Sequence, residues 1–270
     1  MTAAALPSLM TDSTEPTFED PTLVGVTDAT TLRRAVSTVT ALVEECHLRV
    51  GPEGLSMTAT DPATVAMVDL ELSAAAFDRY AAEPAEVAVD VERLSEALSV
   101  ARAGDDVRLA LSVEAGRLSV SFGEVSYAMA LLSPESVRSP PELSELTYDD
   151  HAELTLRGED VSRIVDAADM VASTVALGVD GSAATFYAVA EGDVDDVSLS
   201  RPTEDLDAAA PPAAESLFSL DYLQAVEREL PGDAAVDLRI GTEAPLSADY
   251  AFAEAAGRVE YVVSPRITTR

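Results

Sequence analysis

Three aspartates stand close together in the segment GDVDDVSLS, where their carboxylates could hold a divalent cation. They are Asp193, Asp195 and Asp196, and paired carboxylates can bind magnesium, as a metal-dependent nuclease or hydrolase requires. The chain, however, carries 49 acidic residues, and in such a chain clusters of this kind arise on solvated turns from composition alone. We therefore expect a solvated turn here and no metal site.

Cys46 and His47 are adjacent in the sequence and could act as a nucleophile and its base. Neighbours on a helix point about 100° apart, however, and no third residue is evident to orient the histidine. Cys46 is the only cysteine and His151 the only other histidine, which excludes a disulfide framework or a Cys/His zinc site within one chain. Glycine-rich phosphate loops and GKS/T motifs are absent. We expect no catalytic residues, no metal and no cofactor.

The charge balance indicates a folded protein with a strongly acidic surface. The formal net charge is −32, every one of the 17 basic residues is arginine, and 47% of the residues are hydrophobic, which excludes a disordered chain. Carboxylates stay hydrated in molar salt, where the Debye length falls to about 3 Å and their repulsion is screened. We expect a high-salt, archaeal type of cytoplasm. An acidic protein of an ordinary cell is the alternative, although the absence of lysine argues against it.

Neither a targeting sequence nor a membrane span is evident. Residues 1–20 lack the basic start and apolar core of a signal peptide, and no stretch approaches 18 apolar residues. We expect a soluble, intracellular protein that has no membrane partner and begins with a flexible extension.

The elements that would position any functional site occur in the same order in both halves of the chain. Helical periodicity occurs at 30–45 and 91–103, and again at 159–172 and 219–230, with equivalent points about 129 residues apart. Asp28 and Asp90 are predicted N-caps. Alternating patterns predict strands at 22–26, 47–50, 55–60, 66–72, 86–89, 107–113, 117–122, 124–132, 175–179, 184–190, 194–200, 235–240, 246–253 and 259–263.

Three local features complete this reading. Asp61-Pro62 is interpreted as a turn and nothing more. Phe77 and Tyr80 are expected on a short helical turn, and 202–215 is expected to be a mobile loop.

The chain therefore divides into two similar halves. Residues 133–150 hold three prolines and no glycine, which predicts an extended surface connector. The expected domains are an extension at 1–20, a first domain at 21–132, the connector at 133–150 and a second domain at 151–270. The fold class is α+β, with mainly antiparallel sheets and two helices in each repeated domain. A strand at the end of each half is left at a sheet edge, where it can be used for assembly.

Several separated motifs resemble one known family. The segments GDVDDVSLS, SLFSLDYLQAV, VEYVVSPRI, ADMVASTVALGVDG and TDPATVAMVDLEL are similar to the archaeal and eukaryotic sliding clamp, proliferating cell nuclear antigen, here of a haloarchaeal type. The likeness covers nearly all of 22–267. It implies two clamp domains per chain and a homotrimeric ring of pseudo-six-fold symmetry, with helices lining a hole that encircles duplex DNA. It also implies a processivity factor without enzymatic activity, whose partners are DNA polymerase, clamp loader, ligase and nucleases that carry clamp-interacting peptides.

The resemblance also implies where each contact lies. The subunit interface would use Val125 and Tyr127 from one chain and Val197 and Leu199 from the next. A groove for partner peptides would have as walls Thr64, Met67, Pro245, Val262, Val263, Ser264 and Pro265, with Pro140, Pro141 and Leu143 on the connector side. Plain core packing and a last strand with its tail are the alternatives for these residues.

The family implies basic residues that face DNA, and this sequence has fewer of them than is usual in the family. Basic residues stand at Arg33, Arg34, Arg93, Arg163 and Arg228. Positions that are often basic in the family hold Glu96, Ser99, Asp166 and Asp221. Because molar salt weakens phosphate contacts steeply, a closed ring could hold DNA by topology with few arginines. The alternative function is a diverged clamp paralogue that acts as a partner-binding scaffold, or as a subunit of a heteromeric ring, with weak DNA contact.

Overall fold

The same order of elements occurs twice along the chain. The computed structural model describes residues 18–139, 151–206, 208 and 213–267. The first half contains β1 (Leu23–Asp28), α1 (Ala29–Thr40), β2 (Glu45–Gly51), β3 (Gly54–Thr60), β4 (Ala66–Ser73), η1 (Ala74–Ala76), β5 (Arg79–Ala82), β6 (Ala85–Asp90), α2 (Val91–Ser99), β7 (Asp106–Ser112), β8 (Arg117–Phe122), β9 (Val125–Ala130) and η2 (Pro134–Ser136). The second half contains β10 (His151–Arg157), α3 (Gly158–Asp169), β11 (Thr174–Asp180), β12 (Thr185–Glu191), β13 (Asp196–Pro202), η4 (Thr203–Leu206), β14 (Ala214–Ser219), α4 (Leu220–Glu227), β15 (Ala235–Gly241), β16 (Leu246–Phe252) and β17 (Gly257–Val263).

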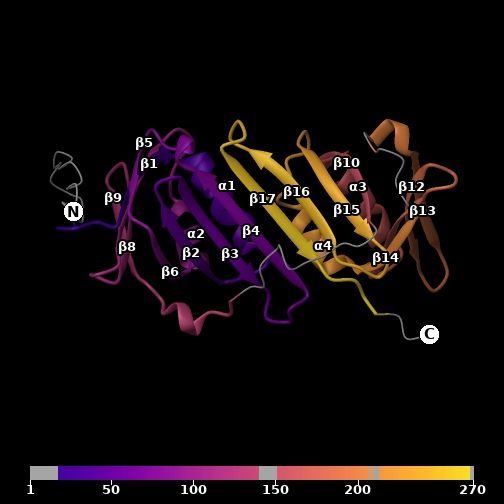
Figure 1. The fold of residues 1–270 in the computed structure, drawn as a ribbon, viewed down its shortest axis with the longest axis horizontal. Helices are drawn as coiled ribbons and strands as arrows, with labels where there is room; N and C mark the ends of the chain where they lie inside the picture. Colours follow the sequence, from indigo (N-terminus) through magenta and orange to yellow (C-terminus); the bar gives the residue numbers. More distant parts are fainter. Residues whose placement is uncertain (1–17, 140–150, 207, 209–212, 268–270) are drawn as a thin grey trace.

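The strands form three antiparallel sheets. The largest has eight strands in the order β10-β15-β16-β17-β4-β3-β2-β6, so it crosses from one half of the chain to the other where β17 pairs with β4 (Figure 1). A five-stranded sheet, β5-β1-β7-β8-β9, and a four-stranded sheet, β13-β12-β11-β14, lie toward opposite ends of the molecule. Each ends in an edge strand, β9 and β13 respectively, with one described neighbour. The two halves are therefore joined in one continuous sheet, and a free edge lies at each end.

The helices cover one face of the eight-stranded sheet. Helix α1 packs against β3 and β4, α2 against β2, α3 against β10 and α4 against β17, and all four lie behind this sheet in Figure 1. The predicted N-caps are confirmed: the Asp28 carboxylate accepts from Thr30 N at 2.7 Å, and that of Asp90 accepts from Arg93 N at 2.9 Å. Within the described part of the chain, the longest helices have 12 residues, and none has the length and apolarity needed to cross a bilayer.

The first helix is shorter than its apolar periodicity predicts. Helix α1 ends at Thr40 and not at residue 45, because Glu45 already pairs with Asp90 as the first residue of β2. Cys46 and His47 do point in different directions, but not because they lie on a helix as predicted. Both lie on strand β2 and face opposite sides of the sheet. Burial raises the pKa of Cys46 to about 12, so its thiol stays protonated and unreactive at neutral pH.

Two further expectations about local structure are corrected. Phe77 follows the short η1 turn with extended backbone angles, and Tyr80 lies in β5, which the sequence analysis missed. Gly25 of β1 leaves close room for the Phe77 ring, since a Cβ there would lie 3.1 Å from it. The predicted loop 202–215 is ordered at its start, since η4 follows β13 directly and buries Leu206, while 207 and 209–212 lie outside the described residues.

Candidate functional site

The turn between β3 and β4 is built around the buried carboxylate of Asp61, which is 4% exposed. Its oxygens accept backbone hydrogen bonds of 2.9, 2.6 and 2.7 Å from Ala63, Val65 and Ala66. Tyr222 Oη of α4 donates a further one at 2.9 Å. Burial alone would raise the pKa of Asp61, but together these hydrogen bonds hold it below its usual value. The expected turn at Asp61-Pro62 is confirmed, since Thr64 N donates to Asp61 O at 2.9 Å. The bond from Tyr222, which the sequence did not predict, also fixes this turn to the second half of the chain.

The pairing of β4 with β17 brings predicted groove residues together from opposite ends of the sequence. Val262 lies opposite Met67 in the register, and Ser264 N donates to Val65 O at 2.7 Å. Met67 and Val262 are buried, yet neither belongs to the hydrophobic core that the helices cover. Because side chains alternate along a strand, the two lie on the outer face of the sheet. The line along which β4 and β17 pair, with Met67 and Val262 on its outer face, is the outer seam. Thr64, at a φ of 60°, lies just before β4 at one end of this seam.

The remaining predicted groove residues are placed differently from one another. Val263 lies opposite Ala66 and packs in the core, so its side chain is not available as a groove wall. Pro245 directly precedes β16, whose first residue pairs with Val263, and both Pro245 and Pro265 are half-buried beside the seam. Pro140, Pro141 and Leu143 lie outside the described residues.

Sequence reasoning missed two polar residues that bind the start of the connector or lie within it. Arg138 is hydrogen-bonded through Nη1 to Thr64 Oγ1 and reaches Pro62 O at 3.4 Å. His47 Nε2 lies 3.2 Å from Val137 O. Arg138 is the one basic residue of the predicted connector 133–150, which is the only signal that could have drawn attention to it.

The four predicted interface residues lie on the two edge strands. In β9, Val125 is 41% exposed, and Tyr127 lies opposite Val120 and packs partly on the core. In β13, Val197 and Leu199 are half-buried. Both edges therefore combine apolar side chains with backbone groups that can pair with a further strand.

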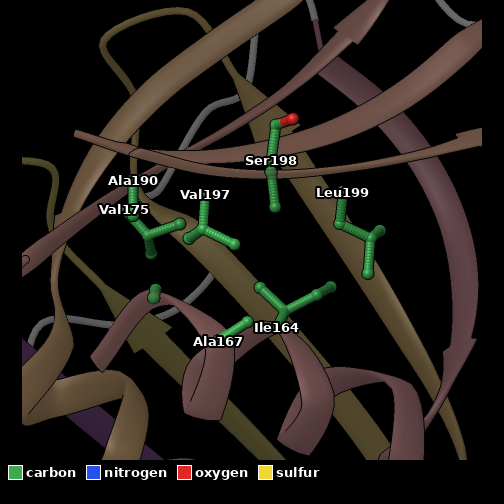
Figure 2. A pocket seen from close by; sticks show the side chains of 9 residues that line it. Ile164, Ala167, Val175, Ala190, Val197, Ser198 and Leu199 are labelled. Carbon is green, nitrogen blue, oxygen red and sulfur yellow. The ribbon is translucent and has the colours of Figure 1, made fainter. Parts of the chain in front are cut away.

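A small apolar cavity lies under β13. Figure 2 shows Val197 and Leu199 directed from the strand toward Ile164 and Ala167 of α3. The cavity has a volume of about 10 Å³, which is too little for an organic ligand. An ion pair holds the far end of the strand, because Arg201 Nη1 lies 2.8 Å from Asp160 Oδ2 at the start of α3. The cavity is thus a packing gap behind the edge strand and does not form a ligand site.

Of three predicted DNA-facing arginines, two pair with an acid at the start of their own helix, and the third is exposed at the end of its helix. Arg93 lies 3.0 Å from Asp90, and Arg163 lies 3.8 Å from Asp160. Arg228 is exposed at the end of α4. Arg93 lies on α2, Arg163 lies on α3 and Arg228 directly follows α4. These helices pack on one face of the eight-stranded sheet (Figure 1).

Arg33 and Arg34 are adjacent but have different surroundings. Arg34 Nη1 donates to the carbonyl oxygen of Glu229 at 3.0 Å, and Ser37 Oγ donates to the carboxylate of Glu229 at 2.7 Å. Arg33 Nε instead donates to Ala29 O within its own helix at 3.4 Å. Arg34 therefore ties α1 to the end of α4, while the Arg33 side chain makes its hydrogen bond within α1.

Asp69, on the outer face of the sheet, has an unusually high pKa. Burial, together with the neighbouring carboxylates of Glu71 and Glu260, raises the pKa of Asp69 to about 6. Glu260 lies directly opposite Asp69 where β17 pairs with β4. An unfolded aspartate has a pKa of about 3.9, so between about pH 4 and 6 the folded chain binds more protons than the unfolded chain. This carboxyl group therefore lowers stability as the pH rises through that window.

Asp69→Asn is expected to raise the free energy of unfolding at pH 8 by about 1–2 kcal/mol, part of the shift being lost to screening by salt. The gain should shrink as the pH falls toward 4 and vanish below the unfolded pKa of about 3.9, where Asp69 is protonated in both states. Thermal unfolding at several pH values in high KCl measures both effects. Asp237→Asn is the matched control, because Asp237 also lies on the outer face but accepts a hydrogen bond from Thr155. An equal gain in both variants at pH 8, or a gain that does not depend on pH, would contradict this assignment.

Comparison with known proteins gives consistent results. Residues 24–127 match the family "Proliferating cell nuclear antigen, N-terminal domain". The chain is 43% identical over 242 residues to a DNA polymerase sliding clamp of Natronomonas pharaonis, covering 90% of this chain and 97% of that protein. It is 42% identical over 242 residues to the one of Haloarcula marismortui, with the same coverage.

Solved structures agree with these sequence relatives. The A. fulgidus PCNA, bound to the C-terminal region of FEN-1, superimposes with a TM-score of 0.85 at 27% identity, covering 92% of this chain and 100% of that one. The PCNA of Thermococcus kodakaraensis superimposes with a TM-score of 0.79 at 26% identity, covering 91% and 100%.

Proposed function

This chain belongs to the family of DNA polymerase sliding clamps, the proliferating cell nuclear antigens, and from that premise we propose that it is a polymerase processivity factor whose three copies close a ring around duplex DNA. The observation that carries the proposal is the pair of free edge strands, β9 and β13, at opposite ends of the molecule. Pairing β9 of one copy with β13 of the next repeats the same head-to-tail contact, and such a contact closes when the rotation allows it.

The helical face is the side proposed to face DNA. In a ring that joins copies end to end, α1 to α4 of every copy would lie on the same face of that copy's eight-stranded sheet. Arg33, Arg93, Arg163 and Arg228 would then point toward the duplex. Because few arginines are available and several are paired with acids, DNA would be held by ring closure, with weak phosphate contacts in molar salt. The proposed role needs no catalytic group, metal or cofactor, and it suits a high-salt cytoplasm near the nucleoid.

The outer seam is proposed as the docking site for partner enzymes. The A. fulgidus relative is described as bound to the C-terminal region of FEN-1, and we extend this binding to the seam of Thr64, Met67, Val262, Ser264 and Pro265 in this chain. An apolar patch beside a strand can receive a short peptide that carries apolar anchors. DNA polymerase, clamp loader, ligase and nucleases would share it. The proposed division of the chain is two clamp domains, 21–132 and 151–270, with the connector 133–150 between them.

Charge reversal on the helical face tests the function. Arg33→Glu with Arg228→Glu is expected to reduce polymerase processivity on circular primed DNA about threefold to tenfold near 1 M KCl, and less near 3 M, because phosphate contacts weaken with salt. Arg34 is left unchanged, since its hydrogen bond to Glu229 joins α1 to the end of α4.

Arg79→Glu, on strand β5 of the five-stranded sheet, is the matched control and should behave as the unchanged protein. If the unchanged chain forms trimers but does not stimulate the polymerase, the chain is the partner-binding scaffold instead. If it stays monomeric in about 3 M KCl, a heteromeric ring replaces the homotrimer.

A further inference from the structure

Strand β13, one of the two strands proposed to join copies, packs loosely on its own chain. Among the described strands it pairs with β12 alone, and each of its residues is half-buried or exposed. Val197 and Leu199 point toward α3, but the small side chain of Ala167 and the small cavity lie between the strand and the helix (Figure 2). Small side chains and a gap leave few atoms in contact with the middle of the strand. Apolar packing therefore gives β13 little support.

The chain is fastened where β13 ends. Thr203, in the η4 turn that follows the strand, is buried and binds the carbonyl oxygen of Ala184 twice, through its N–H at 2.9 Å and its hydroxyl at 3.0 Å. The same turn buries Leu206 and contacts β10. The end of β13 that contains Arg201 thus has a fixed position on the second half of the chain.

Arg201 connects this end of the strand to helix α3. Its Nη1 lies 2.8 Å from Asp160 Oδ2 and its Nη2 donates to Asp160 Oδ1, so the guanidinium binds the carboxylate with two hydrogen bonds. The side chain of Asp160 is 10% exposed and that of Arg201 is 30% exposed. The hydrogen bond from Arg201 is the main reason why the pKa of Asp160 lies below its usual value. The pair is therefore charged at neutral pH.

The ion pair fixes β13 relative to the helix, which the sheet alone does not do. Hydrogen bonds to β12 set the register of the strand, with Arg201 opposite Phe186 and Leu199 opposite Ala188. An edge strand has these backbone bonds on one side only, so its twist away from the neighbouring layer is less restricted. A guanidinium that binds a carboxylate through two nitrogens has a defined geometry. Asp160 therefore limits the directions in which the free backbone groups of β13 point.

We propose that Asp160 and Arg201 are positioning residues that hold β13 in the shape that receives β9 of a second copy of this chain. This inference rests on the proposed function, because it takes β13 as one side of the contact between copies. Without the ion pair, β13 stays hydrogen-bonded to β12 but must be ordered against α3 when two copies meet. Ordering a segment on association lowers the affinity, so trimer formation should weaken more than the fold.

The experiment measures trimer formation of the full chain by light scattering over a dilution series in about 3 M KCl. The main variant is Asp160→Asn with Arg201→Gln, because it leaves no buried carboxylate unpaired and replaces charge-assisted hydrogen bonds by weaker neutral ones. Each contact between copies should weaken about threefold to tenfold. A closed ring of three copies repeats the contact three times, so the trimer formation constant should fall about thirtyfold to a thousandfold.

Single substitutions show whether the two residues act together. Arg201→Gln leaves Asp160 without its main partner and should weaken trimer formation at least as much as the double variant. Arg201→Lys keeps the charge but cannot form the two-pronged bond, so it should recover part of the affinity and still associate less tightly than the unchanged chain. If the double variant loses as much as the two single variants, Asp160→Asn and Arg201→Gln, lose together, the residues act independently and their role as a pair is overturned.

Arg258→Gln with Asp249→Asn is the matched control. Arg258 Nε lies 2.6 Å from Asp249 Oδ2, and the Asp249 side chain is 13% exposed, but this pair joins β16 and β17 inside the eight-stranded sheet. The control should leave trimer formation unchanged. Denaturant unfolding, at concentrations where the mass is that of one chain, compares the stability of the two double variants. Hydrogen exchange of the β13 backbone amides should become faster only in the Asp160 and Arg201 variant.

The outcomes separate this inference from the ring itself. If the unchanged chain is monomeric at every concentration, the ring proposal fails and the positioning role fails with it. If the unchanged chain forms trimers, and either the double variant at Asp160 and Arg201 or Arg201→Lys forms them as tightly, the ring stands and the positioning role is overturned. If both double variants weaken trimer formation equally, the effect comes from general stability, and the positioning role is again overturned.

Discussion

Val125→Asp is expected to convert the proposed trimer into single chains. Val125 lies on the edge strand β9 and is 41% exposed in the isolated chain, so an aspartate there stays hydrated while the chain is alone. In the ring the same carboxylate would be covered by β13 of the next copy with no cation assigned to pair with it. An unpaired buried charge costs about 3–5 kcal/mol, which corresponds to a loss of about two to four orders of magnitude in the association constant at each contact.

The absolute mass from light scattering in about 3 M KCl measures this effect. The unchanged protein should show three times the chain mass of 28.3 kDa, and the variant should show that mass once. Val113→Asp is the control, because Val113 is similarly exposed, at 47%, but lies in the turn after β7 and not on an edge strand. If Val125→Asp stays trimeric, β9 is not in the contact. If both variants dissociate, the effect does not come from the edge strand.

The sequence predicts most of the elements because their signals are local. Alternation of apolar residues located the strands that became edges, including β9 and β13, and the caps at Asp28 and Asp90 were visible as single residues. The end of α1 was missed because Leu42 and Val43 continue the helical stripe although they pack on the core from beyond the helix. Tyr80 was misplaced because β5 is only four residues long and pairs with a strand far away in the sequence.

The site is less predictable, since it depends on contacts between the two halves. Arg33 and Arg34 have the same residue type and lie off the same buried stripe, and only the position of Glu229 after α4 distinguishes them. The same applies to His47, whose bond to Val137 spans 90 residues. The resemblance to a family assigned Met67, Val262 and Val263 to one groove; the register places Val262 opposite Met67, whereas alternation along β17 turns Val263 into the core. Family likeness thus located a segment, and the register of the strand decided which side chains face outward.

Asp61→Ala is expected to cause the largest loss of stability among single substitutions at the groove. The change leaves the N–H groups of Ala63, Val65 and Ala66 without their acceptor and frees Tyr222 from its bond across the two halves. Each buried group that loses its partner costs about 1–3 kcal/mol, and water entering the opened turn recovers part of this. We expect the free energy of unfolding to fall by roughly 3 kcal/mol, and peptide binding to weaken because Thr64 belongs to the same turn.

The pH dependence and a matched control identify the cause of this loss. The folded-state pKa of Asp61 is held below its usual value, so its contribution is fully present above the unfolded pKa of about 3.9 and is lost as the pH falls through the folded value. The difference in stability between the unchanged chain and Asp61→Ala should therefore be constant from pH 6 to 8 and shrink in acid. Asp180→Ala is the control, because Asp180 also accepts hydrogen bonds from a turn, at Ser182 and Ala183, but is exposed to solvent. If both variants lose the same free energy of unfolding, burial of Asp61 and its link to α4 contribute nothing. If Asp61→Ala loses much more, the hydrogen bond between Asp61 and Tyr222 joins the two halves of the chain at the base of the proposed partner groove.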